Sequence, residues 1–205
     1  MPNVSRLVHF ALTSLVLIPL AVAQTARVGA NAPNFQGTDS HIKTEALDQF
    51  RGKYVVLEWH NQGCPYTRKH YESGNMQSLQ KEWTEKGVVW LTVMSSAPGQ
   101  QGYVTAEQEN AYLAKMHAAP TAALLDPDAK IARLYNAKTT PDMYVINPQG
   151  VLIYEGAIDN RPTPDKADIQ GAENYMNEAL IEAMAGKSVA TSYTRSYGCP
   201  VKYKD

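Results

Sequence analysis

The sequence predicts an α/β fold, in which a central sheet carries helices on both of its faces. Its 205 residues are 44% hydrophobic and 19% charged, which is the composition of an ordinary globular domain. From residue 54 onward, short apolar β-branched runs alternate with segments of helical periodicity. A hairpin pattern then precedes the last predicted helix, and this order of elements is typical of α/β sheets.

The first elements lie between residues 28 and 86. Residues 28–40 are rich in Gly, Pro, Ser and Asp and predict a loop or a short hairpin. The run 54–59 is apolar and β-branched, so it predicts a buried strand. Segment 65–86 predicts a helix, because Pro65 suits a first turn and apolar residues recur on one face, with a bend at Gly74. The residues of that face are Met76, Leu79 and Trp83.

The middle of the chain continues the alternation. Residues 88–94 form a second buried apolar run and predict a strand. Thr105 and Gln108, three residues apart, have the pattern of a capping box and predict a helix over 105–117. Residues 122–125 then predict a brief strand.

The last elements are a helix, a hairpin and a second helix. A short helix is expected over 128–135. Residues 142–146 and 151–154 flank an Asn-Pro-Gln-Gly turn and predict a hairpin. The final helix is expected over 168–185, ending at Gly186 as a C-cap.

The N-terminus has the pattern of a secretory signal peptide. An apolar run over 7–20 is interrupted by His9 and Pro19 and is too short to span a bilayer comfortably. It is followed by Ala-Val-Ala, which signal peptidase accepts. We therefore expect cleavage after Ala23 and export to the periplasm or the extracellular space, the alternative being an uncleaved anchor.

The mature chain then divides into a domain over 24–186 and a tail over 187–205 that shows neither helical nor strand periodicity. Nineteen Lys and Arg against 20 Asp and Glu give a net charge of −1, which does not favour nucleic-acid binding. No segment after the signal peptide is expected to span a membrane.

Chemistry is expected at Cys64, between the strand over 54–59 and the helix that begins at Pro65. Unpaired N–H groups and the helix dipole favour a thiolate at this position. Nearby groups add positive or protonatable charge, and a turn of this kind normally leaves the sulfur near the surface. Those groups are His60, Arg68, Lys69 and His70. The alternative is a buried structural cysteine.

Several motifs in this order carry a family resemblance. They are GCPYTRKHY (63–71), GNMQ (74–77), SSAPG (95–99), LDP (125–127), TTPDMYVI (139–146) and YGCPVKY (197–203). The chain resembles the thioredoxin-fold superfamily and, more closely, exported redoxins of the AhpC/TSA peroxiredoxin-like type. The resemblance implies a thioredoxin-like fold with a central mixed sheet, and a cis-proline at Pro141 beside the active sulfur. It also implies a pocket or thiolate-supporting set of Asn61, Pro65, Tyr66, Thr67, Arg68, Thr140 and Pro141 around Cys64.

The sequence departs from two relatives of this type. Peroxiredoxins carry Pro-x-x-x-Thr-x-x-Cys, whereas Leu57 and Asn61 stand at those two positions here. Dithiol thioredoxins have a second cysteine three residues after the first, where this chain has Thr67.

Three functions follow as alternatives. Cys64 attacks a peroxide and becomes a sulfenic acid, or it attacks a disulfide in thiol–disulfide exchange. The third alternative is a non-enzymatic copper or other soft-metal protein that uses Cys64 with His60 or His70. Neither of the two enzymatic functions requires a cofactor, and both require an external thiol reductant such as a thioredoxin-like protein.

Cys199 is expected to be the resolving cysteine or disulfide partner of Cys64. The chain has only two cysteines, export permits oxidation, and the tail is long enough to reach back across the domain. The alternative is that Cys199 pairs with another chain or stays free.

Overall fold

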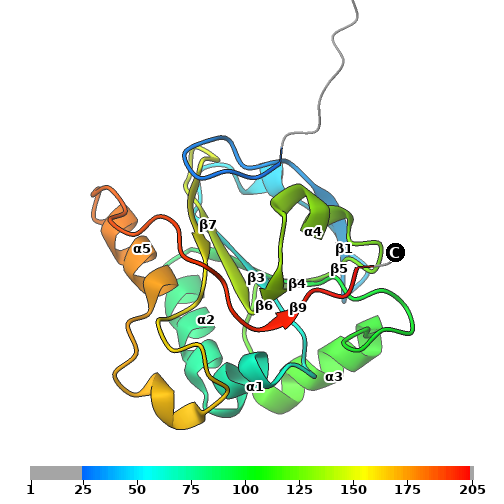
Figure 1. The fold of residues 1–205 in the computed structure, drawn as a ribbon. Coiled ribbons are helices and arrows are strands. Elements are labelled where there is room, and N and C mark those ends of the chain that lie inside the picture. Colours follow the sequence, from blue (N-terminus) through cyan, green and yellow to red (C-terminus); the bar gives the residue numbers. More distant parts are fainter. Residues whose placement is uncertain (1–24, 204–205) are drawn as a thin grey trace, which may run out of the picture.

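The computed structural model describes residues 25–203, so the predicted signal peptide lies outside the described residues. Seven strands form one sheet in the order β2-β1-β5-β4-β3-β7-β8 (Figure 1). The strands are β1 (Gln36–Asp39), β2 (Thr44–Ala46), β3 (Val55–Trp59), β4 (Val89–Met94), β5 (Ala122–Leu125), β7 (Asp142–Ile146) and β8 (Leu152–Gly156). The central strands β3, β4 and β5 are parallel, while β1, β7 and β8 pair antiparallel, so the sheet is mixed as the resemblance implies.

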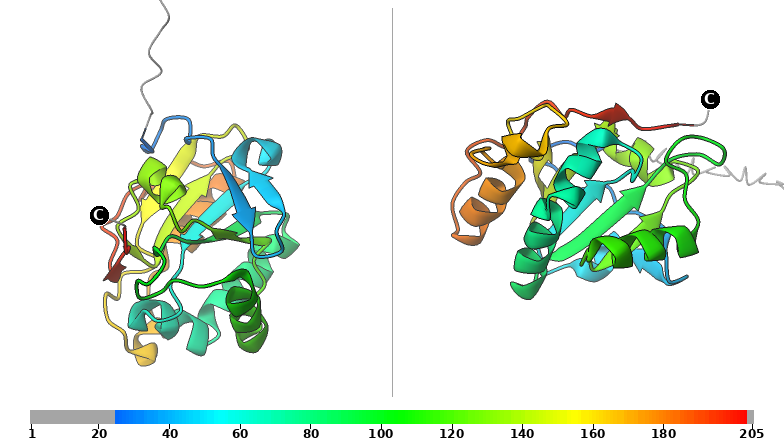
Figure 2. Two further views of the ribbon diagram at one scale, coloured as in Figure 1. Left: turned by 90° about the vertical axis from the view of Figure 1, so that its right-hand side faces the viewer. Right: turned by 90° about the horizontal axis from the view of Figure 1, so that it is seen from below.

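Helices cover both faces of the sheet (Figure 2). They are α1 (Pro65–Glu72), α2 (Asn75–Glu85), α3 (Ala106–Met116), α4 (Lys130–Tyr135) and α5 (Tyr175–Met184), with 3-10 turns η1 (Leu47–Phe50) and η2 (Lys166–Ile169). Helices α1, α2 and α5 pack in one hydrophobic cluster with Val56 and Trp90, while η1 and α4 pack in another with Leu57 and Trp59. Alternation along β3 therefore supplies both cores, because successive side chains point to opposite faces.

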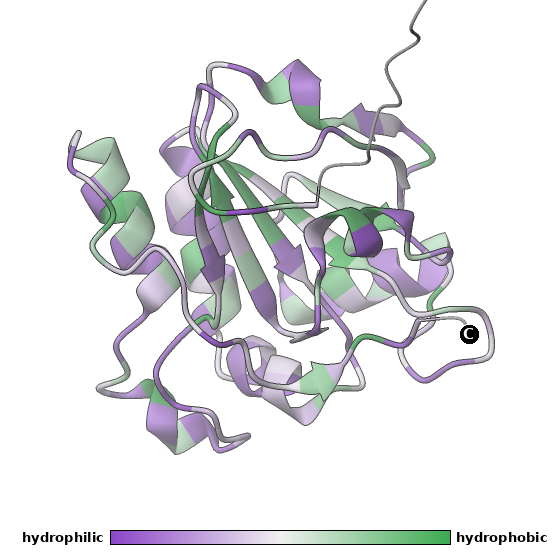
Figure 3. Ribbon diagram, turned by 45° about the horizontal axis from the view of Figure 1, so that its top comes forward, coloured by the Kyte–Doolittle hydropathy of each residue, from purple (hydrophilic) through white to green (hydrophobic). Residues whose placement is uncertain are grey.

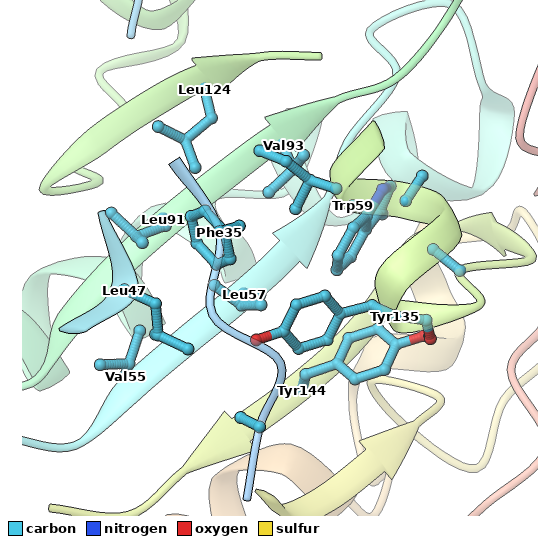
Figure 4. Packing of buried hydrophobic residues seen from close by; sticks show 14 of the residues in the cluster. Phe35, Leu47, Val55, Leu57, Trp59, Leu91, Val93, Leu124, Tyr135 and Tyr144 are labelled. Atoms are coloured by element: carbon cyan, nitrogen blue, oxygen red, sulfur yellow. The ribbon is translucent and has the colours of Figure 1, made fainter. Parts of the chain in front are cut away.

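The core on the α4 side is rich in aromatic side chains (Figure 4). The Trp59 ring lies 5.1 Å from Tyr144 and 5.7 Å from Tyr135, in edge and tilted arrangements. Hydrophobic residues are concentrated on the central strands of the sheet, whereas the helices carry mixed faces (Figure 3). Trp59 ends the strand that leads to Cys64, so this packing holds the start of the site rigidly.

Several predicted boundaries need correction. The predicted helix over 65–86 is two helices, divided at Gly74, where the backbone has a positive φ of 79°. The predicted helix over 168–185 begins only at Tyr175, after a turn in which Gly171 has a φ of 78°. The hairpin expected within 28–40 lies later, over 36–46, and joins the central sheet through β1. The capping box of Thr105 and Gln108 is confirmed.

The C-terminal tail has more structure than its sequence suggests. Within it, β9 (Cys199–Pro200) pairs antiparallel with β6 (Thr139–Thr140). In Figure 1 the tail leaves α5 and crosses the domain to β9, and at its end the ring of Tyr203 lies 4.9 Å from the guanidinium of Arg133 on α4. Val201 is buried in the core on the α4 side, so the end of the tail is part of the packed domain.

Candidate active site

Cys64 is the N-cap residue of α1, directly after the loop that leaves β3. Its backbone N–H donates to the carbonyl of Asn61 at 2.9 Å, and its own carbonyl accepts from the N–H of Arg68 at 2.9 Å. Pro65 follows at the first helical position, where no N–H is needed. The Asn61 side chain accepts from the N–H of Gly63 at 2.9 Å, which holds the turn before the cysteine. The sequence thus places the sulfur at a helix N-terminus, as predicted.

The Cys64 side chain is fully buried, which corrects the expectation of a sulfur near the surface. The turn between β3 and α1 would by itself leave the sulfur exposed. The tail and the loop before Pro141 cover it instead. The Thr140–Pro141 peptide bond is cis, as expected, and the Cys64 thiol donates to the Thr140 carbonyl at 3.0 Å. Pro141 itself is buried.

The pKa of Cys64 is lowered from its ordinary value. Burial is the largest influence and raises the pKa, but it is outweighed by hydrogen bonding from the Cys199 thiol, by Thr140 and by the backbone N–H of Thr67. Only the protonated Cys64 thiol can donate a hydrogen bond to the Thr140 carbonyl. The Cys199 thiol and the backbone N–H of Thr67 in the first helical turn instead stabilise the thiolate. A lowered pKa makes Cys64 the stronger nucleophile of the two cysteines.

Cys199 lies beside Cys64 because β9 pairs with the strand that precedes Pro141. The β6–β9 register places Cys199 directly opposite Thr140, whose carbonyl contacts the Cys64 sulfur. Both cysteines are free thiols in this structure. Burial and the hydrogen bond to Cys64 raise the pKa of Cys199 to about 12, so Cys199 is the protonated partner of the pair.

Two glycines allow the tail to approach this closely. Gly198 has a φ of 137°, and a Cβ there would lie 2.1 Å from the Thr140 carbonyl oxygen. Gly156 also has a φ of 137°, and a Cβ there would lie 2.2 Å from the Thr194 carbonyl. Both positions therefore require glycine for the tail to lie on the domain.

Side chains fix the tail just before Cys199. The Tyr197 hydroxyl donates to the buried carboxylate of Asp159, and the Tyr197 ring lies 5.9 Å from the ring of Tyr66. Lys69 is buried, lies 3.7 Å from the Asp159 carboxylate and donates to the Arg161 carbonyl at 2.8 Å. We call Lys69, Asp159 and Tyr197 the tail latch.

The tail latch was missed by the sequence analysis. Asp159 lies in an irregular loop with no local pattern, and Lys69 was interpreted only as a positive charge near the sulfur. Tyr197 was noted only within the motif that carries Cys199. The contact between these residues joins parts of the chain 38 residues apart or more, which no short pattern reveals.

Most of the predicted basic groups are engaged away from the sulfur. Arg68 is exposed and pairs with Glu72 at 2.6 Å. Burial lowers the pKa of His70 to about 4, aided by the charge of Lys69, so His70 is neutral. His60 is buried, and its pKa is raised by neighbouring charges despite its burial.

The remaining predicted site residues differ in how far they are buried. Thr67 and Thr140 are buried, and the Thr67 hydroxyl has no hydrogen-bond partner. Asn61 is also buried and donates to the side chain of Gln101 at 3.0 Å. Tyr66 is half-buried, and Pro65 is exposed.

The soft-metal alternative lacks a ligand set in this part of the chain. Among residues 25–203, no three or more His, Cys, Asp or Glu side chains are grouped so that they could hold a metal ion. Over the same residues, no helix is long and apolar enough to cross a lipid bilayer.

A cysteine at a helix N-terminus beside a cis-proline, on a mixed sheet of this order, defines a thioredoxin-fold protein with redox chemistry at sulfur. Residues 28–155 match the AhpC/TSA family, and the chain belongs to that family. Membership of this family indicates oxidoreductase activity. No curated protein matches this chain.

Solved structures share the fold at low sequence identity. An uncharacterized conserved protein from Geobacillus kaustophilus is 22% identical, with a TM-score of 0.74 over 87% of this chain and 93% of that one. A hypothetical protein from Sinorhizobium meliloti is 20% identical, with a TM-score of 0.72 over 88% and 97%. A putative thiol:disulfide interchange protein DsbE from Chlorobium tepidum is 21% identical, with a TM-score of 0.53 over 64% and 85%.

Proposed function

We propose that this protein is a thiol–disulfide oxidoreductase in which Cys64 is the nucleophile and Cys199 the resolving cysteine. The observation that supports the proposal is the pairing of β9 with β6, which sets Cys199 directly opposite Thr140, the residue whose carbonyl accepts from the Cys64 thiol. One sulfur has a lowered pKa and the other a raised one, as a nucleophile and its protonated partner require.

The reaction proceeds in two exchanges. The Cys64 thiolate attacks one sulfur of a substrate disulfide, the substrate S–S bond breaks, and the first substrate thiolate leaves and takes up a proton. Cys199 then loses its proton and attacks the Cys64 sulfur of the mixed disulfide, which releases the second substrate thiolate. The enzyme is left with a Cys64–Cys199 disulfide, and the substrate has gained two electrons. An external dithiol, such as that of a thioredoxin-like protein, restores both thiols.

Peroxide reduction is the second candidate, because the chain belongs to the AhpC/TSA family. Here the Cys64 thiolate attacks a peroxide oxygen, water or an alcohol leaves, and the sulfenic acid condenses with Cys199 to give the same disulfide and water. The environment of the sulfur favours this reaction less. Arg68 in the first turns of α1 pairs with Glu72 of the same helix at 2.6 Å, so its charge is not directed at the sulfur to bind a peroxide.

Parallel assays separate the two candidates. Fully reduced protein is mixed with insulin or with hydrogen peroxide, and the loss of its thiols is followed under the same conditions. We expect faster oxidation by disulfides, with a Cys64–Cys199 disulfide as the product in peptide maps. Faster oxidation by peroxide would favour the second candidate, and oxidation of neither cysteine by either reagent would contradict both.

We also propose that the protein is exported and that residues 1–23 are its signal peptide. The proposal rests on the apolar run and the Ala-Val-Ala site of the sequence. An oxidising compartment is also where a Cys64–Cys199 disulfide persists. The N-terminus of the secreted protein should be Gln24, and a cytoplasmic full-length product would contradict the proposal.

A further inference from the structure

A cavity of about 450 Å³ lies between the domain and the C-terminal tail and has no part in the exchange reaction described above. Its domain wall includes Lys138, Asp142 at the start of β7 and Glu155 of β8, and its tail wall is formed by residues 193–196. Small-molecule sites typically have volumes of about 300–1,000 Å³, so the cavity is large enough for one. It exists only where the tail lies on the domain, because each of the two supplies one wall.

The tail wall is held at its two ends and not in its middle. At one end the Thr194 N–H donates to the Glu155 carbonyl at 3.1 Å, and at the other end the tail latch holds Tyr197. Between them, no hydrogen bond or ion pair joins Arg195 or Ser196 to another residue of the described chain. Both residues line the cavity. The middle of the tail wall is therefore available to contact a ligand.

Glu155 is a half-buried acid of the domain wall without a partner. No hydrogen bond or ion pair reaches its carboxylate from residues 25–203. By contrast, the buried carboxylate of Asp126 accepts from the Ser95 hydroxyl at 2.7 Å and from the Ile131 N–H at 3.1 Å. A carboxylate that is partly removed from water without a donor is destabilised, so this wall of the cavity lacks a donor group.

Asp142 is the second acid of the domain wall and is 3% exposed. Its carboxylate accepts from the Lys138 N–H at 3.0 Å and from the Tyr144 hydroxyl at 3.4 Å, but it forms no ion pair within the part of the chain that the structure describes. Burial raises its pKa, and the negative charge of Glu155 adds to the rise. The two cationic side chains that line the cavity, Lys138 and Arg195, are exposed. The cavity therefore has acids on its inner wall and cations at its rim.

We propose that this cavity binds a small zwitterion of the α-amino acid type. The ammonium group of the ligand is held by Glu155 and Asp142 and supplies the donors that Glu155 lacks. The carboxylate of the ligand is held at the rim by Arg195 and Lys138. A simple anion would lie against two carboxylates, and a simple cation would leave both rim cations without a partner, so the arrangement of charges favours a ligand that carries both.

Binding of this ligand stabilises the docked tail. The domain holds its ammonium group and Arg195 of the tail holds its carboxylate, so it binds only the form in which both walls are present and shifts the equilibrium toward that form. Thr139 also lines the cavity and lies in β6, which pairs with β9. The ligand therefore promotes the Cys64–Cys199 disulfide. This last consequence, unlike the binding site itself, rests on the proposed function.

Calorimetric titration with three probes of similar shape and different charge tests the site. L-Phenylalanine carries both charged groups, phenethylamine only the ammonium group and 3-phenylpropionate only the carboxylate. Their phenyl ring suits the three tyrosines that also line the cavity, Tyr135, Tyr144 and Tyr193. We expect L-phenylalanine to bind at least about tenfold more tightly than either of the others, because each charged group adds charge-assisted hydrogen bonds. Equal affinities for the three probes, or no binding of L-phenylalanine, would overturn the proposal.

Substitutions assign the two ends of the ligand. Glu155→Gln should remove most of the preference for L-phenylalanine over 3-phenylpropionate, and Arg195→Gln most of the preference over phenethylamine. Neither side chain has a partner within the described residues, so both variants are expected to fold. The matched controls are Glu85→Gln on α2 and Lys187→Gln in the same tail, both exposed and outside the cavity. If the controls change these preferences as much as the cavity variants do, surface charge in general is responsible and the proposal is wrong.

Hydrogen exchange measures the effect on the tail in the unaltered, reduced protein. The N–H groups of Thr194 and Val201, which donate to the domain, should exchange about tenfold more slowly at an L-phenylalanine concentration about ten times its Kd. Binding without slower exchange would contradict the role of the two walls. Slower exchange with an unchanged Cys64–Cys199 equilibrium in a glutathione buffer would contradict only the proposed role of Cys199.

Discussion

The two cysteines meet at one point of the molecule but are held there in different ways. Cys64 stands at the junction of β3 and α1, where a buried strand and a helix start determine its position. Cys199 stands in a two-residue strand of a tail that has no hydrophobic periodicity. Hydrogen bonds to the domain, two glycines and the tail latch hold that tail in place.

The comparison shows that the core of the fold positions the proposed nucleophile, whereas contacts of the C-terminal tail position its proposed partner. The domain core supports Cys64 directly, so changes in the tail alter its pKa but not its place. Cys199 depends on contacts worth about 1–3 kcal/mol each, so single substitutions can separate it from Cys64. Cys64 is fully buried, and its thiol donates to Thr140, the residue that pairs with Cys199 of the tail, so the tail lies next to the sulfur.

Removing either sulfur should have the largest effect on disulfide reduction, and the two removals should differ in their result. Cys64→Ser should reduce disulfide reduction to the uncatalysed rate, because no thiolate remains at the helix start. Cys199→Ser should still react once but should accumulate a mixed disulfide between Cys64 and the substrate, detectable by non-reducing electrophoresis and mass spectrometry. Full turnover by Cys199→Ser would show that an outside thiol resolves Cys64.

Gly198→Ala should move Cys199 while leaving Cys64 in place. The added Cβ would lie 2.1 Å from the Thr140 carbonyl at a φ of 137°, so β9 must shift away from β6. Strain of about 1–3 kcal/mol should weaken the Cys64–Cys199 disulfide about tenfold or more against a glutathione buffer. The pKa of Cys64 should also rise, because the hydrogen bond from Cys199 is lost.

Gly186→Ala is the control for this substitution. Gly186 has a positive φ of 72°, but nothing lies within 4 Å of a Cβ added there. It should cost stability without changing the disulfide equilibrium. Equal effects of both substitutions would show that backbone strain in general, rather than the contact with Thr140, controls the tail.

Tyr197→Phe should loosen the tail latch with a smaller effect. The substitution removes the hydroxyl that donates to the buried Asp159 carboxylate, two residues before Cys199. A hydrogen bond contributes about 0.5–1.5 kcal/mol net, which predicts about a two- to tenfold weaker disulfide in the same buffer. Tyr193→Phe changes an exposed tyrosine of the same tail and should have no such effect. If the two variants behave alike, Tyr197 does not position Cys199.

The sequence predicted those parts of the molecule that local patterns determine. The strand before Cys64, the capping box at Thr105 and the bend at Gly74 all follow from neighbouring residues. The short polar strands β1 and β2 carry too little apolar alternation to be separated from a loop. The predicted helix over 168–185 began too early, because periodicity does not reveal where the turn at Gly171 ends.

The candidate site likewise contains features that local sequence predicted and features that it did not. Cys64 at its helix start and the cis bond before Pro141 were expected from motifs along the chain. The burial of Cys64 was not, because it depends on a tail that returns from more than 100 residues away. The pairing of β9 has no sequence pattern of its own, since only its contact with β6 makes it a strand.

The smallest effect on the two sulfurs is expected from Asp142, the first residue of β7. Its carboxylate accepts from the N–H of Lys138 at 3.0 Å, and the Lys138 carbonyl accepts from Val201 in the tail at 2.9 Å. Burial raises its pKa to about 7, against about 3.9 in an unfolded chain. The folded state therefore favours the protonated acid. The stability that this acid contributes is complete below about pH 4 and is lost as the pH rises through about 7.

Asp142→Asn keeps a neutral side chain at all pH values, so it isolates this contribution. The free energy of unfolding of the unaltered protein, minus that of Asp142→Asn, should decrease between about pH 4 and pH 7 and stay level above that range. Chemical denaturation at a series of pH values measures the difference. The Cys64–Cys199 equilibrium should differ little between the two proteins, because Asp142 acts on the loop and not on either sulfur. A difference in unfolding free energy that does not vary with pH would show that folding does not raise the pKa of Asp142. A large change in the disulfide equilibrium would place Asp142 with Gly198 and Tyr197 among the residues that position Cys199.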